Sequence, residues 1–168
     1  AGYGTDNQVM NQDKDSDWVF KNKEEGQIAA SASLGMLLLW DIDDGFGGQI
    51  DKYMEHTNID IQAGAFMAYG LINSGITNEM EPVLAVLSEK LTCNEDKLKM
   101  GALMGLSFTY AGSEREDLLQ DIPPIIMDPD NSTELKAVAS LTLGLIYVGT
   151  CNEDVATAIL QTLMEMDG

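Results

Sequence analysis

The stretch "LKMGALMGLSFTYAGS" (residues 98–113) decides the fold, because close counterparts of it recur along the chain. It is apolar almost throughout and rich in glycine and alanine, and similar stretches occupy residues 28–41, 61–75 and 135–150. On one shared register an alanine recurs in steps of 35, 37 and 37 residues: Ala30, Ala65, Ala102 and Ala139. A small residue lies five positions after each alanine: Gly35, Gly70, Ser107 and Gly144. A fixed period of this length indicates stacked supersecondary units that bury their apolar faces against one another.

Each unit is predicted to contain two helices. The first helix is apolar nearly all round, so we expect it to be buried between neighbours, with small residues that let helix backbones approach closely. In the last three units a glycine should end this helix, since glycine adopts the left-handed conformation without steric cost. These glycines are Gly75, Gly112 and Gly149.

A second helix is predicted after each glycine from apolar residues at helical spacing. These residues are Met80, Leu84, Leu87 and Leu91 in one unit, and Val155, Ile159 and Leu163 in another. The face turned to solvent would then hold Glu81, Ser88, Asp154, Gln161 and Glu165. We therefore expect an outer helix with one face buried in the core and one face exposed to solvent.

The predicted fold class is all-α: an α-solenoid of about four helix hairpins, with a period near 37 residues. We expect residues 1–22 to be a polar linker or capping segment and residues 23–168 to be the solenoid. The predicted units lie near residues 26–60, 61–96, 97–133 and 134–168. The composition of "DPDNST" (residues 128–133) predicts a turn between the third and fourth units. Pro123 and Pro124 should kink the third outer helix or end it early.

Charge narrows the class of partner. The chain has 28 acidic and 9 basic residues, with a formal net charge of −19, so its field would repel phosphate backbones. Nucleic acid is therefore an unsuitable partner. The field favours basic proteins or cations, while the alternative is that the acidic residues only keep the protein dissolved.

Cysteines and apolar runs indicate the compartment. Cys93 and Cys151 lie far apart with no CxxC motif, which predicts neither a zinc site nor a disulfide framework and fits a reducing cytosol or nucleus. The first residues lack the basic-then-apolar pattern of a signal peptide. The longest apolar run, Met36 to Trp40, is too short to span a membrane. We expect a soluble chain with no membrane partner.

The sequence argues against an enzyme, a metal site or a cofactor. The stretch from Trp40 to Asp51 begins like a calcium loop, but Phe46 stands where its glycine belongs and Lys52 where its glutamate belongs. The single histidine, His56, cannot complete a catalytic set, and a surface role near a helix end is expected for it. The methionines are interpreted as core filling rather than a binding groove, for instance Met36, Met67 and Met104.

Several stretches resemble a known repeat family. The small residues in "ASLGMLLLW" (32–40) and "AFMAYGLINSG" (65–75), the recurring "AGS" and "VGT" helix ends and the period near 37 are similar to the proteasome/cyclosome (PC) repeats. Longer stretches, "DWVFKNKEEG" (17–26) and "VGTCNEDVATAILQTLME" (148–165) among them, resemble the smaller of two large proteasome subunits that carry these repeats. "DWVFKNKEEG" disfavours the third carrier, a subunit of the cyclosome.

The resemblance implies a docking role. PC repeats close into a toroid of outer and inner helix rings, so about four units would be an arc cut from a longer parent. The implied partners are ubiquitin and polyubiquitin, the ubiquitin-like domains of shuttle factors and other proteasome subunits, with a deubiquitinating enzyme held nearby. The implied location is the cytoplasm and nucleus. The rival is a structural scaffold segment that braces neighbouring subunits without binding ubiquitin, through its inner ring or repeat ends.

The candidate contact surface is acidic. In "YAGSEREDLLQ" (110–120), Ser113 and Glu116 have the form of a capping box, and acids at the equivalent positions Glu79 and Glu153 would suit a helix N-terminus. Other acids exceed what a cap needs, and stacked outer helices would align them into a band. We expect carboxylates to meet the basic rim of a ubiquitin-like fold, and aliphatic atoms such as those of Ala85 and Leu119 to meet its apolar patch. The predicted partner-binding residues are Glu79, Glu81, Ala85, Glu89, Glu114, Asp117, Asp121, Glu153 and Asp154.

Overall fold

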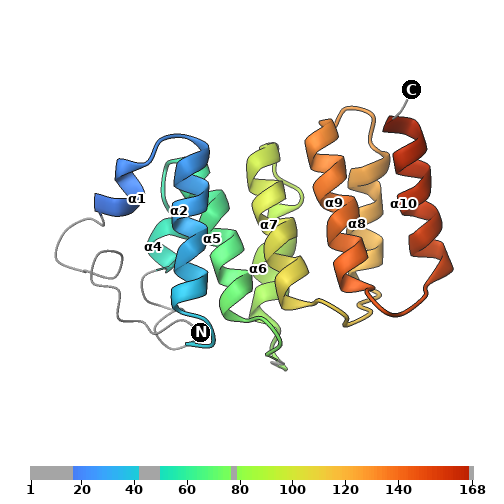
Figure 1. Ribbon diagram of the computed structural model, residues 1–168, viewed down its shortest axis with the longest axis horizontal. Helices are drawn as coiled ribbons and strands as arrows, with labels where there is room; N and C mark the ends of the chain where they lie inside the picture. The colour runs from blue at the N-terminus through green and yellow to red at the C-terminus, as the bar shows by residue number, and fades with distance from the viewer. Residues whose placement is uncertain (1–16, 42–49, 77–78, 167–168) are drawn as a thin grey trace.

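A computed structural model of the chain describes residues 17–41, 50–76 and 79–166. All regular structure in these residues is helical (Figure 1). The helices are α1 (Asp17–Lys21), α2 (Glu25–Leu37), α4 (Ile50–Met54), α5 (Ile59–Ile72), α6 (Pro82–Lys90), α7 (Asp96–Thr109), α8 (Leu118–Met127), α9 (Thr133–Ile146) and α10 (Glu153–Met166). The all-α class and the helical repeat are therefore confirmed.

The helices form two layers that follow the order of the chain. Helices α2, α5, α7 and α9 stand side by side, each packed on the next. The shorter helices α4, α6 and α8 pack against α5, α7 and α9, and α10 packs on α9 and also contacts α8. Helices α1 and α10 lie at opposite ends of the array in Figure 1. The first helix of each predicted unit thus forms one layer and the second helix forms the other.

Helix ends follow local sequence signals. Asn58 accepts hydrogen bonds from the backbone N–H groups of Asp60 and Ile61 at the start of α5, and Ser132 accepts one from Leu135 at the start of α9. The predicted terminating glycines all have positive φ, 71° at Gly75, 70° at Gly112 and 81° at Gly149. The left-handed turn predicted after the first helix of the last three units is confirmed.

Small residues bring the first helices into backbone contact. A Cβ added at Gly64 would lie 2.0 Å from Ser31 Oγ, and one at Gly70 would lie 2.1 Å from the carbonyl oxygen of Gly105. The recurring alanines are buried, with exposures of 2% or less. Thr109 Oγ1 lies 3.1 Å from the Gly70 carbonyl oxygen, so a buried hydroxyl also crosses this interface. No room for a larger side chain exists at Gly64 and Gly70, which explains the glycine at these two positions.

Several core assignments from the sequence are wrong. Met80 lies before α6 and is 88% exposed, and Met36 is 65% exposed on α2. Met67 and Met104 are half-buried, so they pack only in part. The Ser88 hydroxyl, expected to face solvent, is buried. Periodicity along the chain does not show which neighbouring helix covers a given face, and Met80 lies in a turn rather than in a helix.

The prolines do not end α8 early. The helix contains Pro123 and Pro124 and continues to Met127, where the Asp128 N–H bonds the Pro124 carbonyl at 3.1 Å. Burial of Ile122 and Ile126 holds this side of the helix against the core, with exposures of 0% and 3%. Apolar burial therefore outweighs the lost hydrogen bonds of the prolines.

Other predictions have mixed outcomes. A turn lies at residues 128–132, as the composition predicted, and Thr133 already belongs to α9. Residues 17–21 of the predicted linker form α1, whose Val19 is buried, while residues 1–16 lie outside the described part. The rejected calcium loop falls largely on residues 42–49, also outside it, as do the side chains of Leu163 and Glu165. The boundaries of the units stay a prediction. No helix of the described residues has the length and apolar character needed to cross a bilayer.

Gly70→Ala tests the backbone contact. The added methyl group would collide with the Gly105 carbonyl, so we expect a loss of about 1–3 kcal/mol in the free energy of unfolding, measured by urea denaturation. The matched control is Gly144→Ala at the equivalent position of the last unit, where the nearest atom to the added Cβ is 4.0 Å away. That control should be neutral or gain up to about 1 kcal/mol from helix propensity. Equal effects of the two substitutions would refute the packing argument.

Candidate functional site

The predicted partner-binding residues cluster around the second layer of helices. Ala85 and Glu89 are exposed on α6, and Asp121 is exposed on α8. Glu153 and Asp154 are exposed in the first turn of α10. Glu79 and Glu114 are exposed in the loops that precede α6 and α8, and Asp117 is exposed directly before α8. Glu81 differs from the other acids because it is half-buried.

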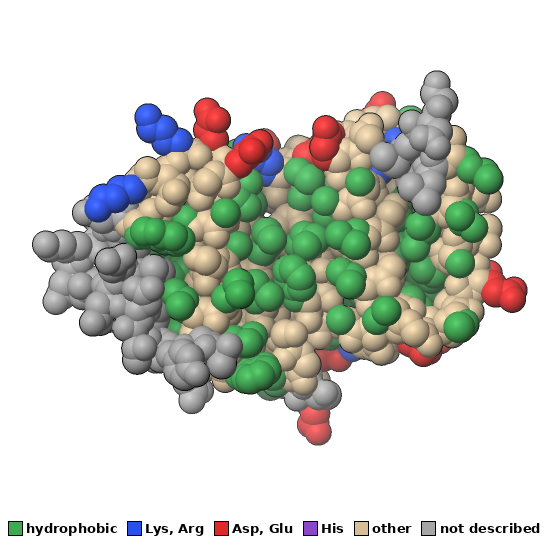
Figure 2. Space-filling view, viewed as in Figure 1, with side chains coloured by type: hydrophobic (Ala, Val, Ile, Leu, Met, Phe, Trp, Pro, Cys, Tyr) green, Lys and Arg blue, Asp and Glu red, His purple; other side chains and the backbone are tan. Residues whose placement is uncertain are grey.

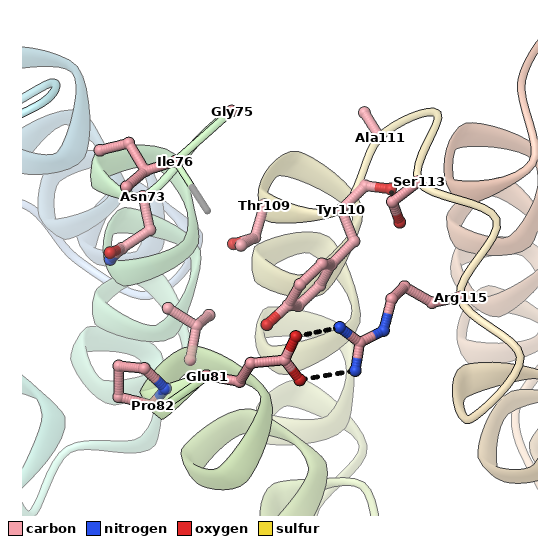
Figure 3. Close-up of a pocket in the computed structure, with 11 residues that line it drawn as sticks. Asn73, Gly75, Ile76, Glu81, Pro82, Thr109, Tyr110, Ala111, Ser113 and Arg115 are labelled. Carbon is pink, nitrogen blue, oxygen red and sulfur yellow. Dashed lines mark hydrogen bonds and ion pairs between the residues drawn. The ribbon is translucent and has the colours of Figure 1, made fainter. Parts of the chain in front are cut away.

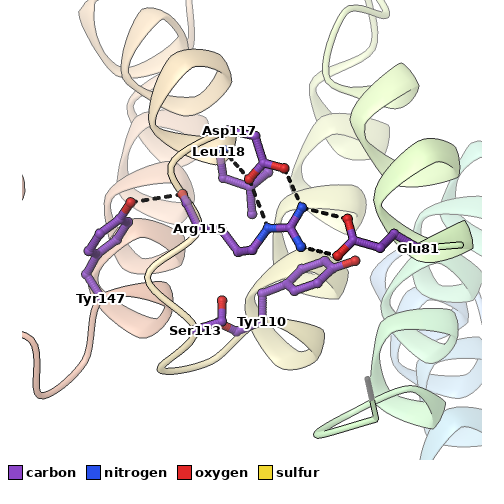
Figure 4. Close-up of polar contacts among 7 residues, drawn as sticks. All are labelled: Glu81, Tyr110, Ser113, Arg115, Asp117, Leu118 and Tyr147. Atoms are coloured by element: carbon purple, nitrogen blue, oxygen red, sulfur yellow. Dashed lines mark hydrogen bonds and ion pairs between the residues drawn. The ribbon is translucent and has the colours of Figure 1, made fainter. Parts of the chain in front are cut away.

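Arg115 joins two of these acids (Figure 4). Its guanidinium contacts both oxygens of the Glu81 carboxylate, one of them with Nη2 at 2.6 Å from Oε2. It also contacts both oxygens of Asp117, with Nε at 3.0 Å from Oδ1. One cation therefore bridges the N-termini of α6 and α8 through two forked contacts, the geometry that a planar guanidinium favours.

The loop that carries Arg115 is held from several sides. The guanidinium lies 5.1 Å from the centre of the Tyr110 ring. The Tyr147 hydroxyl donates a hydrogen bond of 2.9 Å to the backbone carbonyl of Arg115. The backbone N–H groups of Gly112 and Glu114 bond the Leu145 and Ile146 carbonyls of α9 at 2.9 and 3.3 Å. The loop between α7 and α8 is thus attached both to the preceding unit and to the following one.

The electrostatics of this cluster follow from the contacts. Hydrogen bonds from Arg115 lower the pKa of both carboxyls, Glu81 and Asp117, below their ordinary values. The hydrogen bond to Asp117 makes the largest contribution to a raised pKa of Arg115, and the hydrogen bond to Glu81 makes the next largest. Burial raises the pKa of the Tyr110 and Tyr147 hydroxyls. At neutral pH the two carboxylates are charged, but Arg115 offsets much of the field they would present to a partner.

The capping box predicted in this loop is wrong. Ser113 does not cap a helix, because α8 begins only at Leu118; the Ser113 hydroxyl donates to the Tyr110 carbonyl at 2.7 Å. Glu114 has a φ of 55°, which interrupts any helix in the loop, and α8 begins at Leu118 with Asp117 as its N-cap. A capping acid therefore exists, but it lies one residue after Glu116.

The other helix starts also differ from the sequence interpretation. Asn152 Oδ1 caps α10 by accepting hydrogen bonds from the N–H groups of Asp154 and Val155, each at 3.1 Å. The capping residue is therefore Asn152 and not Glu153. Glu153 and Asp154 still lie where the helix dipole favours negative charge. Leu119, expected to be exposed, is half-buried and packs against the core. Of the aliphatic positions named for contact, only Ala85 faces solvent.

The described residues offer little for metal chemistry. Among them no group of three His, Cys, Asp or Glu side chains could hold an ion. His56 Nδ1 accepts a hydrogen bond from the Asn58 N–H at 3.0 Å, and its ring lies 5.5 Å from that of Phe20. Cys93 and Cys151 are free thiols.

Sequence reasoning missed the organising residue of the site. Arg115 is the only basic residue in "SEREDLL" (113–119), between acids on both sides. That isolated charge was the available signal. Its distant partner, Glu81, could not be found from local sequence because 34 residues separate them.

Comparison with known proteins gives a consistent set of relatives. The chain is 41% identical over 168 residues, 98% of its length, to the 26S proteasome regulatory subunit rpn-1 of Neurospora crassa, and covers 18% of that protein. It is 45% identical over 167 residues to the regulatory subunit rpn1 of Schizosaccharomyces pombe, covering 99% of this chain and 19% of that one. It is 38% identical over 165 residues to the 26S proteasome non-ATPase regulatory subunit 2 of Dictyostelium discoideum, covering 98% and 18%. No protein-family model matches. The chain thus spans under a fifth of the length of these relatives.

Arg115→Gln tests the bridge between α6 and α8. The contacts are partly exposed, with 24% of the Arg115 side chain accessible, so we expect a loss of about 1 kcal/mol at pH 7 in urea denaturation. Because folding lowers the pKa of Glu81 and Asp117, this stabilisation is full above their ordinary values of 4.5 and 3.8 and is lost as the pH falls through the folded-state values.

The stability difference between the two proteins should therefore begin to shrink as the pH falls below these ordinary values, and it should vanish only below the lowered folded-state pKa values. Lys97→Gln is the control, since it removes a single exposed contact of 2.6 Å to Asp60. It should cost less at pH 7. A difference between Arg115→Gln and the parent that persists unchanged in acid would show that the guanidinium stabilises by packing alone.

Proposed function

This chain is homologous over nearly its whole length to one segment of the 26S proteasome regulatory subunit Rpn1, and from that premise we propose that it is a non-catalytic docking module. The relatives are named as regulatory subunits, and one of them as a non-ATPase subunit, which agrees with the non-enzymatic role expected from the sequence. The homology also implies that the helical repeat is part of a PC-repeat toroid.

The proposed ligands are ubiquitin chains and the ubiquitin-like domains of shuttle factors. The observation that supports them most is the set of exposed carboxylates on the second-layer helices, namely Glu89, Asp121, Glu153 and Asp154. Glu89 lies 3.4 Å from Lys90 Nζ but stays 75% exposed, so all four carboxylates can meet a basic rim, whereas Glu81 and Asp117 are engaged by Arg115. We therefore assign the direct electrostatic contacts to the first group and a positioning role to the Arg115 pair. Exposed charges of this kind steer association and favour weak, reversible binding.

The remaining partners follow from the same premise. Other subunits of the proteasome regulatory particle would contact the toroid, and a deubiquitinating enzyme would be held nearby. The location would be that of the proteasome, the cytoplasm and the nucleus.

A structural scaffold is the second candidate function. Figure 2 shows hydrophobic side chains gathered over the middle of the face that α2, α5, α7 and α9 present, with charged side chains at its edges. The exposed hydrophobic side chains of the helices in this layer include Met36 on α2 and Leu141 on α9, at 65% and 52%. An apolar surface of this kind favours contact with other protein. Bracing through this face and ubiquitin binding through the other layer are compatible, so the experiment must separate them.

Titration of the isotope-labelled chain with unlabelled ubiquitin, followed by amide chemical shifts, tests the receptor role. We expect saturable shifts on α6, α8 and α10 that weaken as salt is added, because the steering charges are exposed. The double variant Asp121→Lys and Asp154→Lys should weaken binding by about tenfold, equivalent to 1.4 kcal/mol.

The control is Glu134→Lys, which reverses an exposed charge in the first turn of α9. It should bind ubiquitin like the parent, and circular dichroism should show all variants folded. Shifts confined to the apolar face of α2, α5, α7 and α9, or none at millimolar ubiquitin, would leave the scaffold as the function.

A further inference from the structure

A pocket of about 270 Å³ lies between the second and third units (Figure 3). One side is the turn after α5, with Gly75 and Ile76, and the opposite side is the turn after α7, with Ala111 and Ser113. Glu81 and Arg115 line a third side. The turns recur in each unit, but this pocket also needs the loop that Arg115 holds.

The interior of the pocket is suited to one apolar side chain. Ile76, Pro82, Val83 and the Tyr110 ring contribute carbon surface. The volume is below that of pockets that enclose drug-sized ligands, which begin near 300 Å³. This volume has room for one large apolar side chain. A recess of this size fits a residue that projects from an extended segment better than it fits a folded domain.

The pocket also offers polar partners for a peptide. Asn73 is 6% exposed and donates through Nδ2 to the Tyr69 carbonyl at 2.9 Å, which fixes its amide and leaves the side-chain oxygen as an acceptor. Thr109 Oγ1 lies 3.0 Å from the Gly105 carbonyl oxygen and 3.1 Å from that of Gly70. Because the hydroxyl proton is used within the fold, the threonine oxygen can accept from a peptide N–H. Both groups therefore suit a backbone donor.

The charge around the pocket selects a basic ligand. Residues 79, 81, 114, 116 and 117 are all acidic, and Arg115 is the cation between them. The guanidinium is already engaged by two carboxylates, so it offers little repulsion to another cation. Glu114 and Glu116 are exposed and unshielded by that contact. Glu114 lies between the lining residues Ser113 and Arg115, and Glu116 follows Arg115, so a lysine or arginine next to an inserted apolar residue would be attracted to these carboxylates.

We propose that this pocket is a docking site for an extended segment of a partner protein in which an apolar residue is followed by lysine or arginine. The apolar side chain fills the recess, and the basic side chain pairs with Glu114 and Glu116. The ligand is a linear segment rather than a folded ubiquitin-like domain. The site therefore stands whether or not the acids of α8 and α10 bind ubiquitin.

The test uses the blocked hexapeptide Gly-Ser-Leu-Arg-Lys-Gly and two variants of it, one with glycine in place of leucine and one with glutamine in place of both basic residues. Amide shifts of the labelled chain are followed during titration at low salt. We expect saturable shifts at Thr109, Ala111 and Ser113 with the parent peptide. Each peptide variant should bind at least about tenfold more weakly.

Two protein variants locate the ligand. Ala111→Trp places a large ring at the mouth of the pocket, and Ala111 is exposed, so the fold should tolerate it. It should weaken the peptide at least about tenfold, while the matched control Ala137→Trp on the exposed side of α9 should not. Glu114→Gln with Glu116→Gln should remove the preference for the basic peptide and keep the preference for leucine.

Three results would overturn the proposal. Equal binding of the leucine and glycine peptides would show electrostatic association without insertion. Unchanged binding by Ala111→Trp would place the ligand elsewhere. Shifts of the pocket residues that depend on protein concentration without peptide would identify a second copy of the chain as the occupant. Ubiquitin binding that survives Ala111→Trp separates this site from the receptor surface, whose charges Asp121→Lys and Asp154→Lys remove.

Discussion

Backbone-to-backbone contact among α2, α5 and α7 is the constraint on which the rest of the structure depends. Gly64, Gly70 and Gly101 each lie where an added Cβ would fall within 2.4 Å of the helix before or after them. This contact sets the spacing between units, because helices cannot separate without losing buried surface on both sides. Spacing in the first layer then determines where α6, α8 and α10 lie in the second.

The second layer is less tightly specified and is joined by polar contacts. Arg115 connects the starts of α6 and α8, and Tyr147 connects the same loop to α9. These contacts order a surface that exposed acids would otherwise tend to separate by mutual repulsion. They also distinguish the acids by their contacts: Glu81 and Asp117 pair with Arg115, whereas Asp121, Glu153 and Asp154 are exposed on α8 and α10.

Particular residues show which features of the structure can be predicted from the sequence. The four first helices, the positive φ of Gly75, Gly112 and Gly149 and the turn after α8 all follow from short-range patterns, since helix periodicity and left-handed glycine are local properties. The candidate acids could be named as a group in the same way. Met36, Met80, Ser88 and Leu119 were misassigned because burial depends on which neighbouring helix covers each face.

By itself, the sequence determined that this protein is a stack of helix hairpins with an acidic surface, because repeat period, small-residue register and net charge are properties of the chain order. Only the tertiary structure decided that Arg115 pairs with Glu81. Glu81 and Arg115 are separated by 34 residues and meet because adjacent units stack, so their pairing depends on distances through space. The same stacking forms the pocket between the turns after α5 and α7, which neither unit contains alone.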